Sequence, residues 1–314
     1  RRSSDLFIFR SEKNRARCEQ RVWKYISRSV TPMDKSYDVA VGYLEKNPVY
    51  FCVDKVNAIT KIAFIHTDYD KLGMDSIIDK SFFNKLNHIV TVSEECGNVL
   101  KRRFPNFIHK VKVIHNILSP TAINRLASDK ADIAYMGINL ISVGRIVYLK
   151  GFDLAVEACK QLVDNGYKFK WFIVGDGEER YKLEEMITRY QLQNTFILLG
   201  MKENPYPYIK QADIYVHSSR FEGKSIAIDE AKILHKPIVV TNFSTAKDQI
   251  THMKNGLIVD MNAESIYLGV KALLDDRSLR DQLINNLKKE QLGTESEIHK
   301  LYDLINHERK WVHA

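Results

Sequence analysis

Two glutamates separated by seven residues bracket a segment whose order of elements favours ligand binding. An apolar run at 214–216 predicts a buried strand, and a helix is expected to begin near Ser225, a common N-cap residue. Glu222 lies in the loop between them and Glu230 lies about two turns along the helix. Open α/β sheets bind ligands where a loop leaves a parallel strand and enters a helix. Because a helix N-terminus attracts phosphate and Gly223 allows close approach to the backbone, the segment predicts a phosphate site.

This segment, together with the later stretches KPIVVTN and NGLIVD, resembles the Glu-x7-Glu signature of retaining glycosyltransferases of the GT-B fold, family 4. The resemblance covers nearly all of 139–276 and, more loosely, 37–116. It implies two Rossmann-like parallel-sheet domains that face a cleft. It also implies transfer of a sugar from a nucleotide-diphosphate donor, with a UDP-sugar favoured, to an acceptor hydroxyl, with retention and without a metal or other cofactor.

The resemblance also assigns roles to individual residues. Arg145 and Lys150, in SVGRIVYLKG, match the cations that hold the donor diphosphate. Two fixed cations can neutralise a leaving diphosphate without a metal. Glu230 is assigned to the ribose hydroxyls, which a carboxylate accepts well, and Glu222 to the sugar or its phosphate-linked carbon. An isolated glutamate in a loop or helix is usually a solvated surface group. The surrounding motif favours a role in ligand binding for both of these glutamates.

The other expected donor contacts lie on turns that follow strands. The backbone N–H groups of 223–225 would reach the phosphate or the sugar. Lys224 stands where the family more often has an apolar or aromatic residue, so the identity of the sugar is open. The base is expected near 199–201. The full set of these expected contacts is Gly144, Gly175, Asp176, Met201, Gly223, Lys224 and Ser225.

His66 is the leading candidate in the first half of the chain. It follows the apolar run 61–65, which predicts a strand. The resemblance implies that this histidine faces the donor sugar across the cleft, although a single histidine at a strand end is more often structural. Asp68 and Asn116 are weaker candidates. Ser93 and Glu94 resemble a family segment on the hinge side of the cleft.

Alternating strands and helices predict the elements that must position these residues, and they indicate parallel sheets. We expect an N-terminal acceptor-side domain over 1–118, joined by a crossover helix at 296–314, and a donor-binding domain over 119–295. The stretch 118–137 is expected to link the two. In the family that the chain resembles, a first strand and a glycine-rich turn come before a strand like 37–43, and here only a basic, helix-like stretch does. The N-terminal domain is therefore expected to lack its start, or the chain is a naturally shortened variant. Strands are expected at 37–43, 61–65, 88–92, 110–114, 139–143, 169–174, 195–199, 214–216, 237–240 and 256–259.

Composition limits the class of protein. The chain has 314 residues, a net charge of +8 and scattered cysteines without CxxC spacing. Such cysteines are typical of reduced thiols in a cytosolic protein. No apolar run reaches the roughly 18–20 residues of a membrane span. The charge would suit nucleic acid, an anionic membrane or a phosphorylated substrate, or it is a solvated basic surface. No nucleic-acid motif is present.

The stretch before residue 37 is the most basic part of the chain. Its apolar residues fall at helical spacing among cations, so it predicts an amphipathic helix that lies on anionic lipid or packs on the domain. The shortness of the apolar stripe favours packing. The apolar flank consists of Cys18, Val22, Trp23 and Ile26, and the cations are Arg10, Lys13, Arg15, Arg17, Arg21, Lys24 and Arg28.

FEGKSIAIDEAKIL resembles bacterial enzymes of surface polysaccharide assembly, whose acceptors are lipid-linked oligosaccharides at the cytoplasmic face of the membrane. Three alternatives remain: a nucleotide-sugar epimerase of the same fold, a non-catalytic nucleotide-sugar binding protein, and a basic scaffold on a membrane surface. The sequence has no Ser-His-Asp order, no HExxH motif and no clustered Asp pair for a metal.

Overall fold

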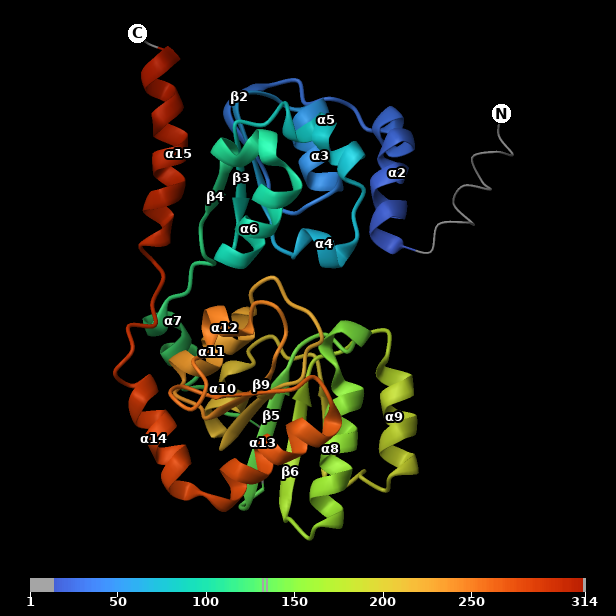
Figure 1. The fold of residues 1–314 in the computed structure, drawn as a ribbon, viewed down its shortest axis with the longest axis vertical. Coiled ribbons are helices and arrows are strands. Elements are labelled where there is room, and N and C mark those ends of the chain that lie inside the picture. Colours follow the sequence, from blue (N-terminus) through green and yellow to red (C-terminus); the bar gives the residue numbers. More distant parts are fainter. Residues whose placement is uncertain (1–13, 132, 134, 313–314) are drawn as a thin grey trace, which may run out of the picture. The chain divides into compact units, whose positions relative to one another are not determined.

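The computed structural model describes residues 14–131, 133 and 135–312, and these form two compact units (Figure 1). The first unit takes in residues up to Asn116 together with those from Ser296 onward, and the second runs from Ile117 to Glu295. Each unit contains one parallel sheet, in the order β1-β2-β3-β4 and β10-β9-β8-β5-β6-β7. Two parallel α/β sheets are the predicted fold class.

The sheet of the first unit is covered on both faces. One face packs on a cluster that includes Val49, Ile65, Phe83 and Leu100. On the other face, apolar residues of β2 and β3 pack against Leu301, Leu304 and Ile305 of α15. The elements of this unit are α2 (Arg15–Ser29), β1 (Ser36–Gly42), α3 (Asn47–Lys55), β2 (Asn57–Ile65), α4 (Tyr69–Leu72), α5 (Ser76–Phe83), β3 (His88–Thr91), α6 (Glu94–Arg103), η1 (Pro105–Lys110), β4 (Val111–Val113) and α15 (Glu297–Val312).

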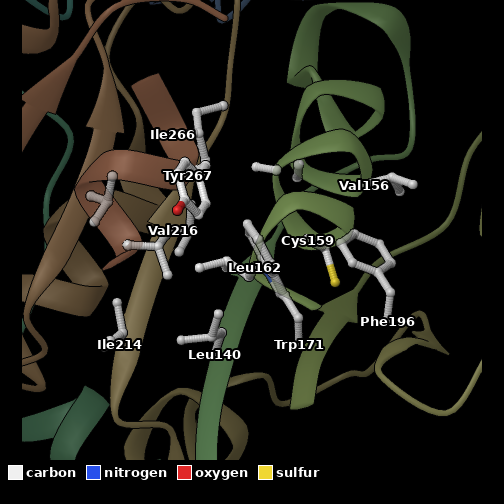
Figure 2. Close-up of a cluster of buried hydrophobic side chains, with 14 of the residues drawn as sticks. Leu140, Val156, Cys159, Leu162, Trp171, Phe196, Ile214, Val216, Ile266 and Tyr267 are labelled. Carbon is white, nitrogen blue, oxygen red and sulfur yellow. The ribbon is translucent and has the colours of Figure 1, made fainter. Parts of the chain in front are cut away.

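The second unit has three layers, because the residues of its strands alternate between two apolar clusters. Leu140 and Trp171 face α8 and α13 (Figure 2), whereas Ile141 and Phe172 face α10 and α11. Buried parallel strands are apolar on both faces for this reason. Its elements are α7 (Pro120–Leu126), β5 (Ile138–Val143), η2 (Tyr148–Lys150), α8 (Phe152–Asp164), β6 (Phe169–Val174), α9 (Arg180–Arg189), β7 (Phe196–Gly200), α10 (Tyr206–Gln211), β8 (Ile214–His217), α11 (Ile226–Ile233), β9 (Ile238–Thr241), α12 (Ala246–Gln249), β10 (Leu257–Val259), α13 (Ala263–Asp275) and α14 (Arg277–Leu287).

The basic helix α2 packs on the first unit, as the short apolar stripe favoured, and Trp23 of that stripe is buried. Its buried residues are Ala16, Gln20 and Trp23. Gln20 donates to the buried carboxylate of Asp79, and the Trp23 indole donates to Asp54 at 2.9 Å. Ile26, at the end of the predicted stripe, is 37% exposed. The buried face therefore includes Trp23 of the predicted stripe together with Ala16 and Gln20, whereas Ile26 lies at its exposed margin. Arg10 and Lys13 of the predicted helix lie outside the described residues.

The stretch 118–137, which we expected to be an interdomain linker, belongs to the second unit. It forms α7, which begins after the N-cap Ser119, whose hydroxyl accepts a hydrogen bond from the Ala122 N–H. Leu118, Ile123 and Ala127 join the cluster beneath α10 and α11. The apolar spacing was too short to predict a helix, and burial against the sheet stabilises it.

Candidate functional site

The predicted donor residues gather where the order of the second sheet reverses. β5 and β8 are neighbours, and the sheet extends from β5 through β6 to β7 and from β8 through β9 to β10. In open α/β sheets this switch point is the usual ligand site. Lys150 lies in the loop after β5 and Glu222 in the loop after β8. The predicted strand, loop and helix around Glu222 are therefore confirmed, and they meet the β5 loop at this edge.

The carboxylate of Glu222 is the centre of a half-buried polar cluster. Its Oε1 accepts from Lys150 Nζ at 2.5 Å and from Ser219 Oγ at 2.7 Å. The same oxygen lies 3.0 Å from Nε2 of His217. His217 is buried at the end of β8, and its Nδ1 lies 3.4 Å from the Tyr215 hydroxyl. Three neighbours thus hold one oxygen of Glu222 in place.

This cluster keeps Glu222 ionised. Burial by itself raises the pKa of Glu222, but the hydrogen bond from His217 and the charge of Lys150 outweigh it and lower the pKa to about 2. Burial lowers the pKa of His217, which favours the neutral imidazole despite the nearby carboxylate. The ion pair between Lys150 and Glu222 is largely withdrawn from water, since the two side chains are 22% and 13% exposed. It is therefore stronger than a surface pair.

Glycines let the loops after β5 and β6 interlock. Gly175 has φ +148°, and a Cβ there would lie 1.9 Å from the Gly144 carbonyl oxygen. A Cβ on Gly177 would lie 2.3 Å from the carbonyl oxygen of Ile146. The Gly144 N–H donates to Val174 and the Ile146 N–H to Asp176. The turn at Gly175, Asp176 and Gly177 therefore fixes the start of the loop that carries Arg145 and Lys150.

The first turn of α11 differs from the prediction in one respect. Ser225 occupies the N-cap position, but its side chain makes no capping bond, and its N–H donates to Gln249 Oε1 at 2.9 Å. The Ser225 N–H, which we expected to face the phosphate or the sugar, is bonded in this structure to a side chain of α12. Gly223 is buried beside it. The Lys224 ammonium lies 3.8 Å from Asp229 Oδ2, on the same helix.

Glu230 lies on α11, where the Tyr206 hydroxyl donates to its Oε1 at 2.9 Å. Burial raises the pKa of Glu230, and the hydrogen bond from Tyr206 opposes that rise. Burial and the charge of Glu230 raise the pKa of Tyr206 to about 12, so the phenol remains a donor. A carboxylate with one oxygen already bonded by a phenol can accept further hydroxyl groups.

The remaining predicted donor residues are more exposed. Arg145 is exposed and makes no ion pair with the side chains that the structure describes. Met201 is 83% exposed in the loop after β7. Asp176 Oδ1 accepts from the Gly177 N–H at 2.8 Å, and its Oδ2 lies 3.6 Å from Arg180. These residues follow β5, β6 and β7, so they share the edge that carries Lys150.

His66 directly follows β2 in the first unit, at the strand end where the sequence placed it, and its side chain is partly buried. Burial lowers the pKa of its imidazole, while the charge of Glu45 and a hydrogen bond with the Tyr43 main chain oppose that shift. Among the described residues, no group bonds its buried Nε2. Glu45 also accepts from the His66 N–H at 3.0 Å and from the Thr67 hydroxyl at 2.7 Å. A neutral imidazole with one unbonded nitrogen suits a hydroxyl ligand.

Two of the weaker candidates have structural roles. Asp68 is the N-cap of α4 and accepts from the N–H groups of Asp70 and Lys71. Ser93 caps α6 by accepting from the Cys96 N–H. Glu94 lies in the first turn of α6. Asn116 is the last residue of the first unit before the chain enters the second.

The sequence reasoning missed several residues that hold the site together. His217, Ser219 and Tyr206 touch the predicted glutamates directly. The signal for His217 was present, since a histidine at the end of an apolar strand stands at the ligand edge of the sheet. Tyr206 and Gln249 lie on other helices, and sequence spacing gives no indication of their contacts.

Two general features of the described residues bear on function. None of their His, Cys, Asp and Glu side chains come together in a group of three or more that could hold a metal ion. No helix within the described ranges combines the length and the apolar character needed to cross a membrane.

A family model described as "Glycosyl transferases group 1" matches residues 127–290. This match covers more than half of the chain. It includes both glutamates, the loop with Arg145 and Lys150, and all six strands of the second sheet.

Two curated relatives extend the match into the first unit. The capsular polysaccharide biosynthesis glycosyltransferase CapM of Staphylococcus aureus is 27% identical over 257 residues, which cover 81% of this chain and 61% of that protein. N-acetylgalactosamine-N,N'-diacetylbacillosaminyl-diphospho-undecaprenol 4-alpha-N-acetylgalactosaminyltransferase of Campylobacter jejuni is 27% identical over 226 residues, 70% of this chain and 60% of that protein. The chain thus spans 43% to 61% of the length of these and two further curated relatives.

A solved structure shares the fold. A variant of S. aureus TarM in complex with fondaparinux, α-GlcNAc-glycerol and UDP superposes with a TM-score of 0.68 at 22% identity. The match covers 82% of this chain and 53% of that one. At this identity the likeness shows the fold alone, and it agrees with the predicted pair of parallel α/β sheets.

Proposed function

The chain belongs to the glycosyl transferases group 1 family, and from that membership we propose that it is a retaining glycosyltransferase of family 4. It moves a sugar from a nucleotide-diphosphate donor, with a UDP-sugar favoured, to an acceptor hydroxyl. The observation that carries the proposal is the Lys150–Glu222 pair at the switch point, with Nζ and Oε1 2.5 Å apart. A cation and a carboxylate placed together there suit a ligand that has both a diphosphate and hydroxyl groups.

Each part of the donor has a partner in the second unit. Arg145 and Lys150 neutralise the diphosphate, so the reaction needs no metal. Glu230, held by Tyr206 at 2.9 Å, accepts the ribose hydroxyls. Glu222 faces the sugar. The base contacts the turn that contains Met201, and the backbone N–H groups of Gly223, Lys224 and Ser225 face the phosphate or the sugar. Gly144, Gly175 and Asp176 complete the proposed donor contacts.

In the first unit, His66 is the further catalytic residue of this proposal, as the family resemblance implies. In the transfer step the bond between the anomeric carbon and the diphosphate oxygen breaks, and a bond to the acceptor oxygen forms on the same face of the sugar. The proton of the acceptor hydroxyl passes to the leaving phosphate oxygen. Arg145 and Lys150 stabilise the charge that develops on that phosphate.

The acceptor that we propose is a lipid-linked oligosaccharide in the synthesis of a surface polysaccharide. The C. jejuni relative is named for a diphospho-undecaprenol acceptor, and the S. aureus relative for capsule biosynthesis. A net charge of +8 suits an anionic lipid surface, and we place the protein in the cytoplasm at the inner face of the cell membrane.

Calorimetric titration with UDP, GDP and ADP tests the donor site. We expect UDP to bind in the micromolar range, worth about 8 kcal/mol, and Arg145→Ala/Glu230→Ala to lose most of this affinity. The control is Arg189→Ala/Glu185→Ala, which removes one charge of each sign from the exposed side of α9. If none of the nucleotides binds to the folded chain, the donor site is wrongly assigned.

Turnover of a panel of radiolabelled nucleotide sugars then separates the possible activities. Release of UDP with transfer or hydrolysis of the sugar supports the glycosyltransferase. Tight nucleotide binding with no turnover, in the presence of lipid-linked acceptors, would indicate a non-catalytic binding protein.

A further inference from the structure

Arg220, in the loop after β8, binds the segment that follows β5 through several hydrogen bonds. The guanidinium of Arg220 donates to both carboxylate oxygens of Asp153, each at 2.7 Å, and its Nη1 also donates to the Tyr148 carbonyl at 2.9 Å. The same guanidinium lies 4.3 Å from the centroid of the Tyr148 ring. The Arg220 main-chain N–H donates to the Leu149 carbonyl at 2.8 Å. Arg220 therefore contacts both main-chain carbonyls and the Tyr148 ring of the turn η2.

The Arg220–Asp153 pair is strong because it is bidentate and partly withdrawn from water. The two side chains are 17% and 22% exposed. Burial raises the pKa of Asp153, but the hydrogen bonds and charge of Arg220 outweigh it, so that pKa lies below its usual value. The hydrogen bond to Asp153 likewise raises the pKa of Arg220. Bidentate arginine–carboxylate pairs fix geometry as well as adding binding energy.

A second contact closes the other end of the turn. Ser218 Oγ donates to the Lys150 carbonyl at 2.9 Å. Gly151, with φ +62°, leaves no room between the loops, since a Cβ there would lie 2.2 Å from the Ser218 carbonyl oxygen. Arg220 and Ser218 thus hold the three residues 148–150 from both ends. Lys150, the last of them, reaches Glu222 in the same loop after β8.

We propose that Arg220 is a positioning residue, which holds η2 against the loop after β8 and so fixes Lys150 beside Glu222 for the donor diphosphate. The inference rests on the proposed function. It assigns Arg220 no contact with the diphosphate, because its Nη1 and Nη2 groups are already bonded to Tyr148 and Asp153.

The test compares Arg220→Met, Arg220→Lys and Asp153→Asn with the wild type. We expect Arg220→Met and Asp153→Asn each to weaken UDP binding about tenfold, with Arg220→Lys in between because lysine cannot bind bidentately. Since the two residues act as one clamp, the double variant Arg220→Met/Asp153→Asn should be no weaker than the poorer single variant. Independent, additive losses would overturn the clamp.

The control is Arg280→Met. Arg280 also donates to main-chain carbonyls, those of Leu273 and Leu274, but at the junction of α13 and α14. Arg280→Met should lower the melting temperature and keep the UDP dissociation constant of the folded protein within about twofold of the wild-type value. A loss of UDP affinity as large as that of Arg220→Met would mean that general loosening explains both, and would overturn the proposal.

A readout without ligand separates this inference from the proposed function. Carbon-13 NMR titration of Glu222 should give a higher pKa in Arg220→Met and Asp153→Asn than in the wild type, because Lys150 no longer lies close. An unchanged Glu222 pKa in both folded variants overturns the clamp, whether or not any nucleotide binds. If the Glu222 pKa rises in the variants but the wild type binds no nucleotide, the positioning role of Arg220 stands. The assignment of the donor site would then be wrong.

Discussion

Lys150 Nζ lies 2.5 Å from Glu222 Oε1, so the cation that we assign to the diphosphate is paired with a carboxylate of the same site. Ser219 and His217 contact the same oxygen. A diphosphate that binds Lys150 must therefore compete with Glu222 or displace it. The two residues should have opposite effects on nucleotide affinity, although both are needed for sugar transfer.

The first prediction follows from this competition. Lys150→Met should weaken UDP binding by about 10- to 100-fold, the loss of one charge-assisted contact of roughly 1.5–3 kcal/mol. Glu222→Gln should strengthen UDP binding several-fold, because the lysine becomes available, and should abolish sugar transfer. Calorimetry gives the affinities and donor turnover gives the activities. Weaker UDP binding by Glu222→Gln would show that the carboxylate supports the nucleotide instead of competing with it.

Two glycines in the left-handed region provide a matched pair for the second prediction. Gly166 has φ +81° and no heavy atom within 4 Å of an added Cβ, whereas the Cβ of an alanine at Gly151 would meet Ser218. Gly166→Ala should cost about 1–2 kcal/mol of unfolding free energy, from backbone strain alone. Gly151→Ala should cost about 1–3 kcal/mol more, from overpacking between the loops.

Urea denaturation measures both changes in the free energy of unfolding, and UDP titration separates their effects on the site. Gly151→Ala should also weaken UDP binding, because it displaces the turn that places Lys150 at the donor site, whereas Gly166→Ala should leave the UDP affinity unchanged. Equal unfolding free energies for the two variants would contradict this prediction, because they would show that the loops after β5 and β8 can separate without loss of stability.

The periodicity of the sequence predicted the second unit well, for a physical reason. Its strands are buried on both faces, so each is a nearly continuous apolar run bounded by glycine or polar turns, as in 169–174 and 238–241. The edge of the sheet that carries the site follows from strand order alone. The loops that carry Lys150 and Glu222 could therefore be placed at this edge, whereas the roles expected of the two residues came from the family resemblance.

Contacts between elements far apart in sequence were not predictable. Gln249 takes the Ser225 N–H from α12, and Tyr206 reaches Glu230 from α10. A single sequence gives no measure of such pairings, because they depend on how helices pack. The burial of Gln20 on α2 was missed for the same reason, since it follows from a bond to Asp79, a residue on α5.

The buried face of α2 can be tested with two of its apolar residues. Trp23 is 5% exposed and donates to Asp54, whereas Ile26 is 37% exposed. Trp23→Ala should lower the unfolding free energy by about 3–5 kcal/mol. Ile26→Ala should change it by less than about 1 kcal/mol. Thermal or urea unfolding measures both changes. A larger loss of unfolding free energy from Ile26→Ala than from Trp23→Ala would show that Ile26 belongs to the buried face.

The last prediction concerns the ionisation of Glu230. Burial raises the pKa of this carboxyl above its ordinary value of 4.5, and the Tyr206 hydrogen bond holds the rise in check. If the ionised form accepts the ribose hydroxyls, its contribution to UDP affinity is present above the raised pKa and is lost as the pH falls through it. The ratio of the UDP dissociation constants of Glu230→Gln and wild type isolates this contribution, since titration of the nucleotide affects both proteins equally.

That ratio should be about tenfold at pH 7.5, the value of one good hydrogen bond to a charged group, and should approach one in acid. Tyr206→Phe removes the bond that lowers the Glu230 pKa, so the midpoint of the decline should move to higher pH. Calorimetric titrations at half-unit steps between pH 4.5 and 7.5 would resolve both midpoints. A ratio that is constant over this range would mean that Glu230 acts through shape or packing, and the ribose assignment would then be wrong.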